Sequence, residues 1–130
     1  MPTIFSKIIS NEIQSYKIAE SKDFLAFLDV RPLCAGHTLV VPKIETDYIF
    51  DINDEQYIGL QLFAKKVAVA IKKAIPCKRI GVAVIGLEVP HAHIHLVPLN
   101  AIADLNFENE RKKFTPEEYQ NIADNIKKFL

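Results

Sequence analysis

The alternation of apolar and polar positions in the first third of the chain predicts an antiparallel arrangement of strands. Apolar-rich runs over residues 16–20 and 24–29 flank Ser21-Lys22-Asp23, which is the pattern of a hairpin. A third strand is predicted over residues 37–41, and Pro42 is expected to end it because proline has no amide hydrogen to donate to a ladder. These three runs indicate one half of a sheet.

A second hairpin is predicted in the C-terminal half of the chain. Residues 80–85 form a continuous apolar run that indicates a buried strand, and residues 86–90 have the composition of a turn. Residues 91–97 are expected to form the returning strand, which is again followed by a proline, Pro98. The sheet therefore has an expected size of about five strands.

Two stretches carry the helical period instead. Asn53 can cap a helix that continues to about Ala74, ahead of Pro76. The apolar positions of this long helix are Ile58, Leu62, Phe63, Val67, Ala70 and Ile71. Thr115 and Pro116 begin a final helix towards Leu130, with a capping-box glutamate at position 118. Its apolar stripe, suited to docking on the sheet or on a second subunit, consists of Tyr119, Ile122, Ile126 and Phe129.

The order of these elements predicts the fold class. Residues 3–9 add a short helix or turn, and the strands are mostly sequential, so we expect an α+β domain on an antiparallel sheet. With 130 residues and 49% hydrophobic content, the chain can bury one core. We therefore expect a single domain over 1–130, in which 100–130 is a polar extension that ends in a helix.

Charge and cysteine content exclude several classes of function. Lysine plus arginine equals aspartate plus glutamate at 16 each, so no overall field favours nucleic acid or an anionic membrane. No apolar run has the length of a signal peptide or a membrane span, which predicts a cytoplasmic protein. In such a protein Cys34 and Cys77 are expected to be reduced thiols.

The candidate chemistry lies in the strand over residues 91–97. His91, His93 and His95 recur at every second position, so they are expected on one face while Ala92, Ile94 and Leu96 pack behind them. Such a face can hold zinc together with a ligand from elsewhere, or it can support covalent catalysis by an imidazole. A histidine-rich surface strand without a role is the third interpretation.

This segment resembles a known family. The run from His91 to Val97 is similar to the His-φ-His-φ-His-φ-φ signature of the histidine triad (HIT) superfamily, where φ is apolar or small, and its Hint-like branch looks most similar. Residues 3–9, 25–30 and 36–43 resemble other segments of that family in its order, so the resemblance spans roughly residues 3–99. It implies a HIT-like domain with one long central helix.

The resemblance also implies roles for four histidines. His93 would be the nucleophile that attacks an α-phosphorus, and the main-chain carbonyl of His91 would hold its Nδ1 hydrogen. His95 would contact a phosphoryl oxygen and donate a proton to the leaving group, and His37 would flank the same phosphate. These four residues are the expected catalytic set.

A nucleoside site is implied in the same way. Asp29 would accept hydrogen bonds from the two ribose hydroxyls, although the residues alone favour a strand-end turn aspartate. Five apolar residues match positions that sandwich the base in the family and would be core residues on sequence alone: Ile4, Phe5, Ile8, Phe27 and Val30.

The chain departs from the family at several positions. Many relatives bind zinc through Cys-x-x-Cys and a later histidine, where this chain has Thr3, Ser6 and Glu45, so no structural zinc is expected. The loop before the triad is short, and Glu88 lies where a small hydroxylated residue often contacts phosphate. The asparagine usual on the preceding strand has no match in residues 82–85.

The resemblance implies a homodimeric hydrolase that cleaves a purine nucleoside 5′-phosphoramidate or a related adenylate through a nucleotidyl-histidine intermediate. It implies no metal and no cofactor. Three alternatives remain: a dinucleoside polyphosphate hydrolase, a nucleotide-binding or protein-interaction module with weak or lost turnover, and a zinc protein built on the histidine face.

Overall fold

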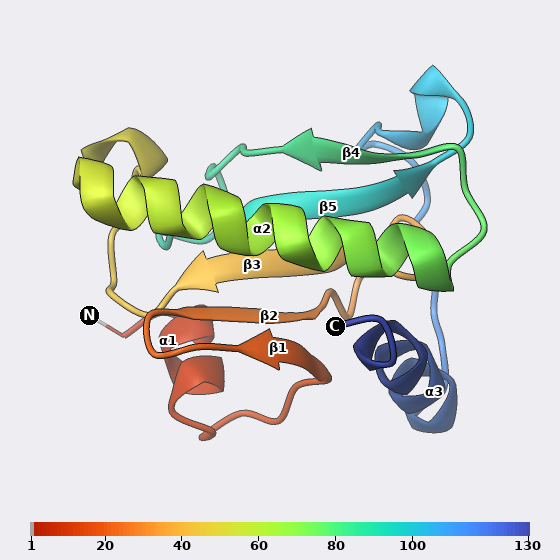
Figure 1. The fold of residues 1–130 in the computed structure, drawn as a ribbon, viewed down its shortest axis with the longest axis horizontal. Coiled ribbons are helices and arrows are strands. Elements are labelled where there is room, and N and C mark those ends of the chain that lie inside the picture. Colours follow the sequence, from red (N-terminus) through yellow and green to blue (C-terminus); the bar gives the residue numbers. More distant parts are fainter. Residues whose placement is uncertain (1) are drawn as a thin grey trace.

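A computed structural model describes residues 2–130 as a five-stranded antiparallel sheet with helices on both faces (Figure 1). The strand order is β1-β2-β3-β5-β4. The strands are β1 (Lys17–Glu20), β2 (Phe24–Leu28), β3 (Thr38–Pro42), β4 (Arg79–Ala83) and β5 (Ile94–Leu99). The helices are α1 (Ile4–Ile9), α2 (Asp54–Ala74) and α3 (Pro116–Lys127), with short 3-10 turns η1 (Ile49–Asp51) and η2 (Ile102–Asp104). The predicted fold class and the number of strands are confirmed.

The two faces of the central strands are both buried, because side chains alternate between two cores. On β2, Ala26 and Leu28 face the large core under α2, whereas Leu25 and Phe27 face a smaller core that includes Phe5 and Ile8 of α1. Figure 1 shows α2 lying across one face of the sheet and α1 on the other side. This double burial explains why β2 is a continuous apolar run and why β3 is apolar after Thr38.

Helix α2 begins as predicted, but part of its expected apolar stripe faces away from the sheet. The Asn53 side chain accepts a hydrogen bond from the Gln56 amide and caps the helix. The buried residues are Leu60, Ala64, Val67, Ala70 and Ile71. Ile58 and Leu62 are instead about 60% exposed, at 58% and 62% respectively, so their expected place in the core is wrong. Their side chains lie on a different side of α2 from the side chains that pack against the sheet.

Strand β5 begins and ends later than predicted. Pairing starts at Ile94, so His91 and His93 lie in the segment before the strand. Pro98 lies within the strand opposite Ile80 rather than ending it. Its carbonyl accepts from Cys34 Sγ at 3.5 Å, on the side where pairing with β3 has ended. Because no strand pairs with β5 on that side at this position, the missing amide hydrogen of Pro98 costs the sheet no hydrogen bond, and the proline is tolerated.

Strand β4 is an exposed edge strand, so the prediction of a buried strand over residues 80–85 is wrong. It pairs with β5 as expected, but its other edge is free within residues 2–130. Val82, Val84 and Ile85 are 41–58% exposed. A continuous apolar run cannot distinguish a buried strand from an edge strand that awaits a partner.

Helix α3 packs against α2, β1 and β2 and is capped as predicted. Thr115 and Glu118 form a reciprocal capping box with Pro116 at the start of the helix. Tyr119, Ala123 and Ile126 are buried, whereas Phe129 is 45% exposed. Both cysteines are free, and no helix in the described part of the chain is long and apolar enough to cross a membrane.

Candidate active site

Four histidines meet beside β3 and β5, on the face of the sheet opposite α2; His95 lies on β5, and the other three lie just before these two strands. His95 of β5 lies opposite Leu39 of β3, and His37 comes immediately before β3. Ala92, Ile94 and Leu96 point into the large core, as the alternation predicted. All four imidazoles are at most 8% exposed, so the interpretation as a surface strand is wrong.

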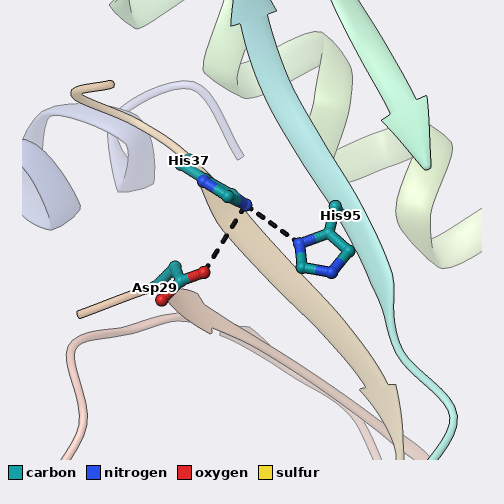
Figure 2. Close-up of side chains that lie close together, drawn as sticks. All are labelled: Asp29, His37 and His95. Atoms are coloured by element: carbon teal, nitrogen blue, oxygen red, sulfur yellow. Dashed lines mark hydrogen bonds and ion pairs between the residues drawn. The ribbon is translucent and has the colours of Figure 1, made fainter. Parts of the chain in front are cut away.

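His37 and His95 form a direct imidazole pair, and the main chain determines where their protons lie. The Leu33 amide donates to His37 Nδ1 at 2.9 Å, so the proton of neutral His37 is on Nε2. His37 Nε2 then donates to His95 Nδ1 at 3.0 Å, as drawn in Figure 2. His95 therefore carries its proton on Nε2, which can donate it to a ligand.

His93 is oriented by a main-chain carbonyl, which accepts a hydrogen bond, rather than by an amide, which donates one. Its Nδ1 lies 2.7 Å from the carbonyl oxygen of His91, which can only accept, so the proton is on Nδ1 and Nε2 keeps its lone pair. The contact expected between these two histidines is present. An imidazole in this state has the free nitrogen that nucleophilic catalysis requires.

Burial keeps three of these histidines neutral. The pKa of His37 is lowered to about 4, mainly by desolvation and also by Arg111, and that of His95 to about 3, mainly by desolvation and also by the neighbouring imidazoles. Burial also lowers the pKa of His93, although its hydrogen bond to the His91 carbonyl opposes this. The neutral state agrees with the proton positions that the main chain imposes.

Thr3, Ser6 and Glu45 hold the ring of His91. His91 Nε2 donates to the Pro42 carbonyl at 2.8 Å, so its Nδ1 accepts from the Thr3 hydroxyl at 2.9 Å. The Ser6 hydroxyl and the Thr3 amide both donate to Glu45 Oε1 at 2.9 Å. Two alcohols and a carboxylate that already bond to one another lack the thiolates of a structural zinc site. This group does not fit a zinc ion, and it positions His91 by hydrogen bonds instead.

A second group of possible metal ligands consists of Asp29, His37 and His95, whose donor atoms lie within 4.8 Å of one another. Figure 2 shows Asp29 and His95 on either side of His37 Nε2. A metal at that nitrogen would move the proton of His37 to Nδ1, where it would face the Leu33 amide hydrogen. These residues therefore fit the hydrogen bond between His37 and His95 better than a metal ion.

Asp29 lies at the end of β2 with free hydrogen-bonding capacity. Its Oδ1 accepts from the Arg31 amide at 2.8 Å. Its Oδ2 lies 3.6 Å from His37 Nε2, which is too long for a hydrogen bond, and the neutral His37 forms no ion pair with it. A carboxylate can accept about four hydrogen bonds, so Asp29 can bind further donors.

The five residues expected to sandwich a base divide into two groups. Phe5, Ile8 and Phe27 are buried in the smaller core, and the Phe5 ring lies 4.9 Å from that of His93. Ile4 and Val30 are 49% and 61% exposed and are available to a ligand. The first group supports the site from behind, while the second can contact a bound molecule directly.

Phe107 also belongs to the site, although the sequence pattern did not indicate it, because it lies in the polar extension between η2 and α3. Its ring centroid is 4.7 Å from that of His95 and 6.1 Å from that of His37, so it covers this pair. Arg111 lies over the Phe107 ring at 5.4 Å. The only signal in the sequence was an isolated aromatic residue in a polar stretch, which has no period to indicate its burial.

This arrangement of a triad, a fourth histidine and an aspartate on an α+β sheet defines the class of histidine triad proteins. Residues 10–102 match the HIT domain family, so the chain belongs to that family. A Hit-like protein from Bartonella henselae has the same fold, with a TM-score of 0.85 at 31% identity over 98% of this chain and 96% of that one.

Two relatives show how far the similarity extends. The Bacillus subtilis protein named hit is 33% identical over an alignment of 139 positions, which covers 98% of this chain and 93% of that protein. The adenosine 5′-monophosphoramidase of Saccharomyces cerevisiae is 38% identical over 96 residues, covering 73% of this chain and 61% of that enzyme. The similarity to the HIT superfamily is thereby confirmed, and the yeast relative supports the Hint-like branch.

The lowered pKa values of His37 and His95 predict that the stability of the folded chain falls at acidic pH. The pKa values of His37 and His95 are lower in the folded than in the unfolded chain, so the unfolded chain binds more protons below about pH 6.5. Each residue should reduce the free energy of unfolding by about 1.4 kcal/mol per pH unit as the pH falls from about 6 towards 4. Urea titrations measure this, and a free energy that is constant down to about pH 4.5 would contradict it.

Proposed function

We propose that the protein hydrolyses a purine nucleoside 5′-phosphoramidate or a related adenylate at the α-phosphorus, through a covalent intermediate on His93. The observation that carries this proposal is the 2.7 Å hydrogen bond between His93 Nδ1 and the His91 carbonyl, which leaves Nε2 with a lone pair. The similarity to a yeast adenosine 5′-monophosphoramidase supports the choice of substrate.

The proposed reaction has two steps and needs no metal. In the first, His93 Nε2 forms a bond to the α-phosphorus while the bond to the leaving nitrogen breaks, and that nitrogen takes up one proton. In the second, water attacks the same phosphorus, the bond to Nε2 breaks, and the water returns one proton to the solvent. The products are AMP and an amine, and His93 is restored.

His95 and His37 would serve the phosphate and the leaving group. Neutral His95 can donate from Nε2 to a phosphoryl oxygen, and His37 fixes this orientation through its bond to His95 Nδ1. A bound phosphate also raises the pKa of His95 because opposite charge stabilises the imidazolium. The imidazolium, which gives up the hydrogen bond from His37 at Nδ1, would then pass its Nε2 proton to the leaving nitrogen and return to the neutral form.

The nucleoside would occupy the surface between Asp29 and the exposed apolar side chains. Asp29 would accept hydrogen bonds from the ribose hydroxyls, while Ile4 and Val30 would contact the base. A dinucleoside polyphosphate is the alternative substrate, since the same attack would release a nucleotide. A comparison of diadenosine polyphosphates with adenosine 5′-phosphoramidate separates the two.

The first test is AMP release from adenosine 5′-phosphoramidate in the presence of a chelator. We expect turnover by the native chain and a loss of at least about 10³-fold in His93→Gly, because no other group has a free nitrogen at the phosphorus. His95→Asn should lose about 10²-fold, as expected for one hydrogen-bond donor to the phosphoryl group. Activity that disappears from the native protein with chelator would instead favour a metal-dependent reaction.

Glu88 is the residue that favours a weak enzyme or a binding module. It is exposed in the loop before the triad, and its carboxylate is near enough to oppose slightly the lowering of the His93 pKa by burial. A negative charge there should repel a phosphate. A protein that binds AMP without releasing product from phosphoramidates or polyphosphates would have this alternative function.

We predict that Glu88→Gln increases the affinity for AMP by about 3- to 10-fold at low ionic strength, and less at high salt. Isothermal titration calorimetry measures this affinity. Glu117→Gln removes a similar exposed charge at the start of α3 and should leave the affinity unchanged. Equal affinities of native protein and Glu88→Gln would show that the carboxylate points away from the phosphate.

A homodimer formed through the free edge of β4 is the assembly we propose. Exposed apolar side chains at this edge would pair with those of a second copy, and strand addition would bind the unpaired main-chain groups. We predict that the native chain sediments as a dimer and that Val82→Lys sediments as a monomer. Ile13→Lys, beyond the opposite edge at β1, is the matched control, and a monomeric native chain would overturn the proposal.

A further inference from the structure

We propose that Tyr119 of α3 is a positioning residue for Asp29, which it orients through a single peptide unit. The inference rests on the proposed function, in which Asp29 binds the ribose hydroxyls. It assigns part of the nucleotide site to the C-terminal extension, which lies outside the matched family domain at residues 10–102.

The connection runs through the peptide that joins Val30 to Arg31. The Arg31 amide of this peptide donates to Asp29 Oδ1 at 2.8 Å. The Val30 carbonyl of the same peptide accepts from Tyr119 Oη at 3.2 Å. Because a peptide unit is planar and rigid, the phenol at one end controls the direction of the amide hydrogen at the other.

The neighbouring carbonyls are bound by the same extension. Arg111 Nη1 donates to the Arg31 carbonyl at 2.6 Å, and the Lys112 amide donates to the Pro32 carbonyl at 2.8 Å. The three consecutive carbonyls of residues 30–32 therefore all accept hydrogen bonds from the C-terminal extension. Val30 and Arg31 have exposed side chains, so this part of the loop is held by these hydrogen bonds, whereas the following Pro32 and Leu33 are buried.

Tyr119 itself is held firmly enough to serve as an anchor. It is 7% exposed, its ring stacks on Tyr16 at 4.9 Å, and Phe114 contacts it edge-on at 5.4 Å. Burial and the charge of Asp29 raise the pKa of the phenol, so it remains a hydrogen-bond donor. An aromatic side chain fixed on three sides gives the loop a rigid support.

The consequence is a specific effect on ribose recognition. Without the phenol, the peptide can rotate and Asp29 loses its fixed direction, while the phosphate site at His93 and His95 is unchanged. The binding of a nucleotide that has ribose hydroxyls should therefore weaken, and the binding of one without them should not. A general loss of folding would weaken both equally.

The experiment measures dissociation constants for AMP and 2′,3′-dideoxy-AMP by calorimetry. We expect native protein to prefer AMP by about tenfold, Asp29→Asn to lose this preference, and Tyr119→Phe to reduce it to about two- to threefold by weakening AMP alone. Arg111→Gln, which removes the adjacent contact, should change the ratio in the same direction. Tyr48→Phe and Lys113→Gln are exposed controls that should keep the native ratio.

The outcomes separate the two proposals. A tenfold preference retained in Tyr119→Phe and Arg111→Gln but lost in Asp29→Asn would overturn the positioning role and leave the proposed function intact. Equal binding of both nucleotides by native protein would overturn the role of Asp29 and with it this inference. Native protein that binds neither nucleotide would overturn the proposed function itself.

Discussion

The hydrogen bond between His93 Nδ1 and the His91 carbonyl is the interaction on which the candidate site depends. A main-chain carbonyl cannot donate, so it determines the proton position of His93 without a second titrating group. The Pro42 carbonyl does the same for His91, and the Leu33 amide does so for the pair formed by His37 and His95. The chemistry of four side chains is therefore set by backbone groups that carry no pKa near neutrality.

The fold provides these backbone groups because they lie outside the stretch in which β3 pairs with β5, which covers residues 38–40 and 94–96. Residues before β3 and before β5 leave the ladder just where the histidines lie, so their amides and carbonyls are free to bond to rings. Burial then lowers the pKa values of His37, His93 and His95. A structural zinc is not needed to hold His91, since Thr3 and Glu45 form a hydrogen-bonded support in its place.

Much of the fold could be predicted from local patterns. Asn53 and Thr115 cap helices as expected, since a cap depends on residues within one turn. The burial of β4 and of Ile58 on α2 was predicted wrongly, because apolar character does not reveal whether a partner element is present. Asp29 and the histidines were identified through a motif, whereas Phe107 and Tyr119 reach the site from a segment remote in sequence.

By itself, the sequence determined the class of fold, the face on which the three histidines lie and the family to which the chain belongs. These features follow from side-chain periodicity and from short motifs, which are local properties. The tertiary structure alone decided the proton positions, the lowered pKa values and the link from Tyr119 to Asp29. Each depends on a main-chain group or on burial contributed by a distant segment, and no local pattern of residues encodes such a contact.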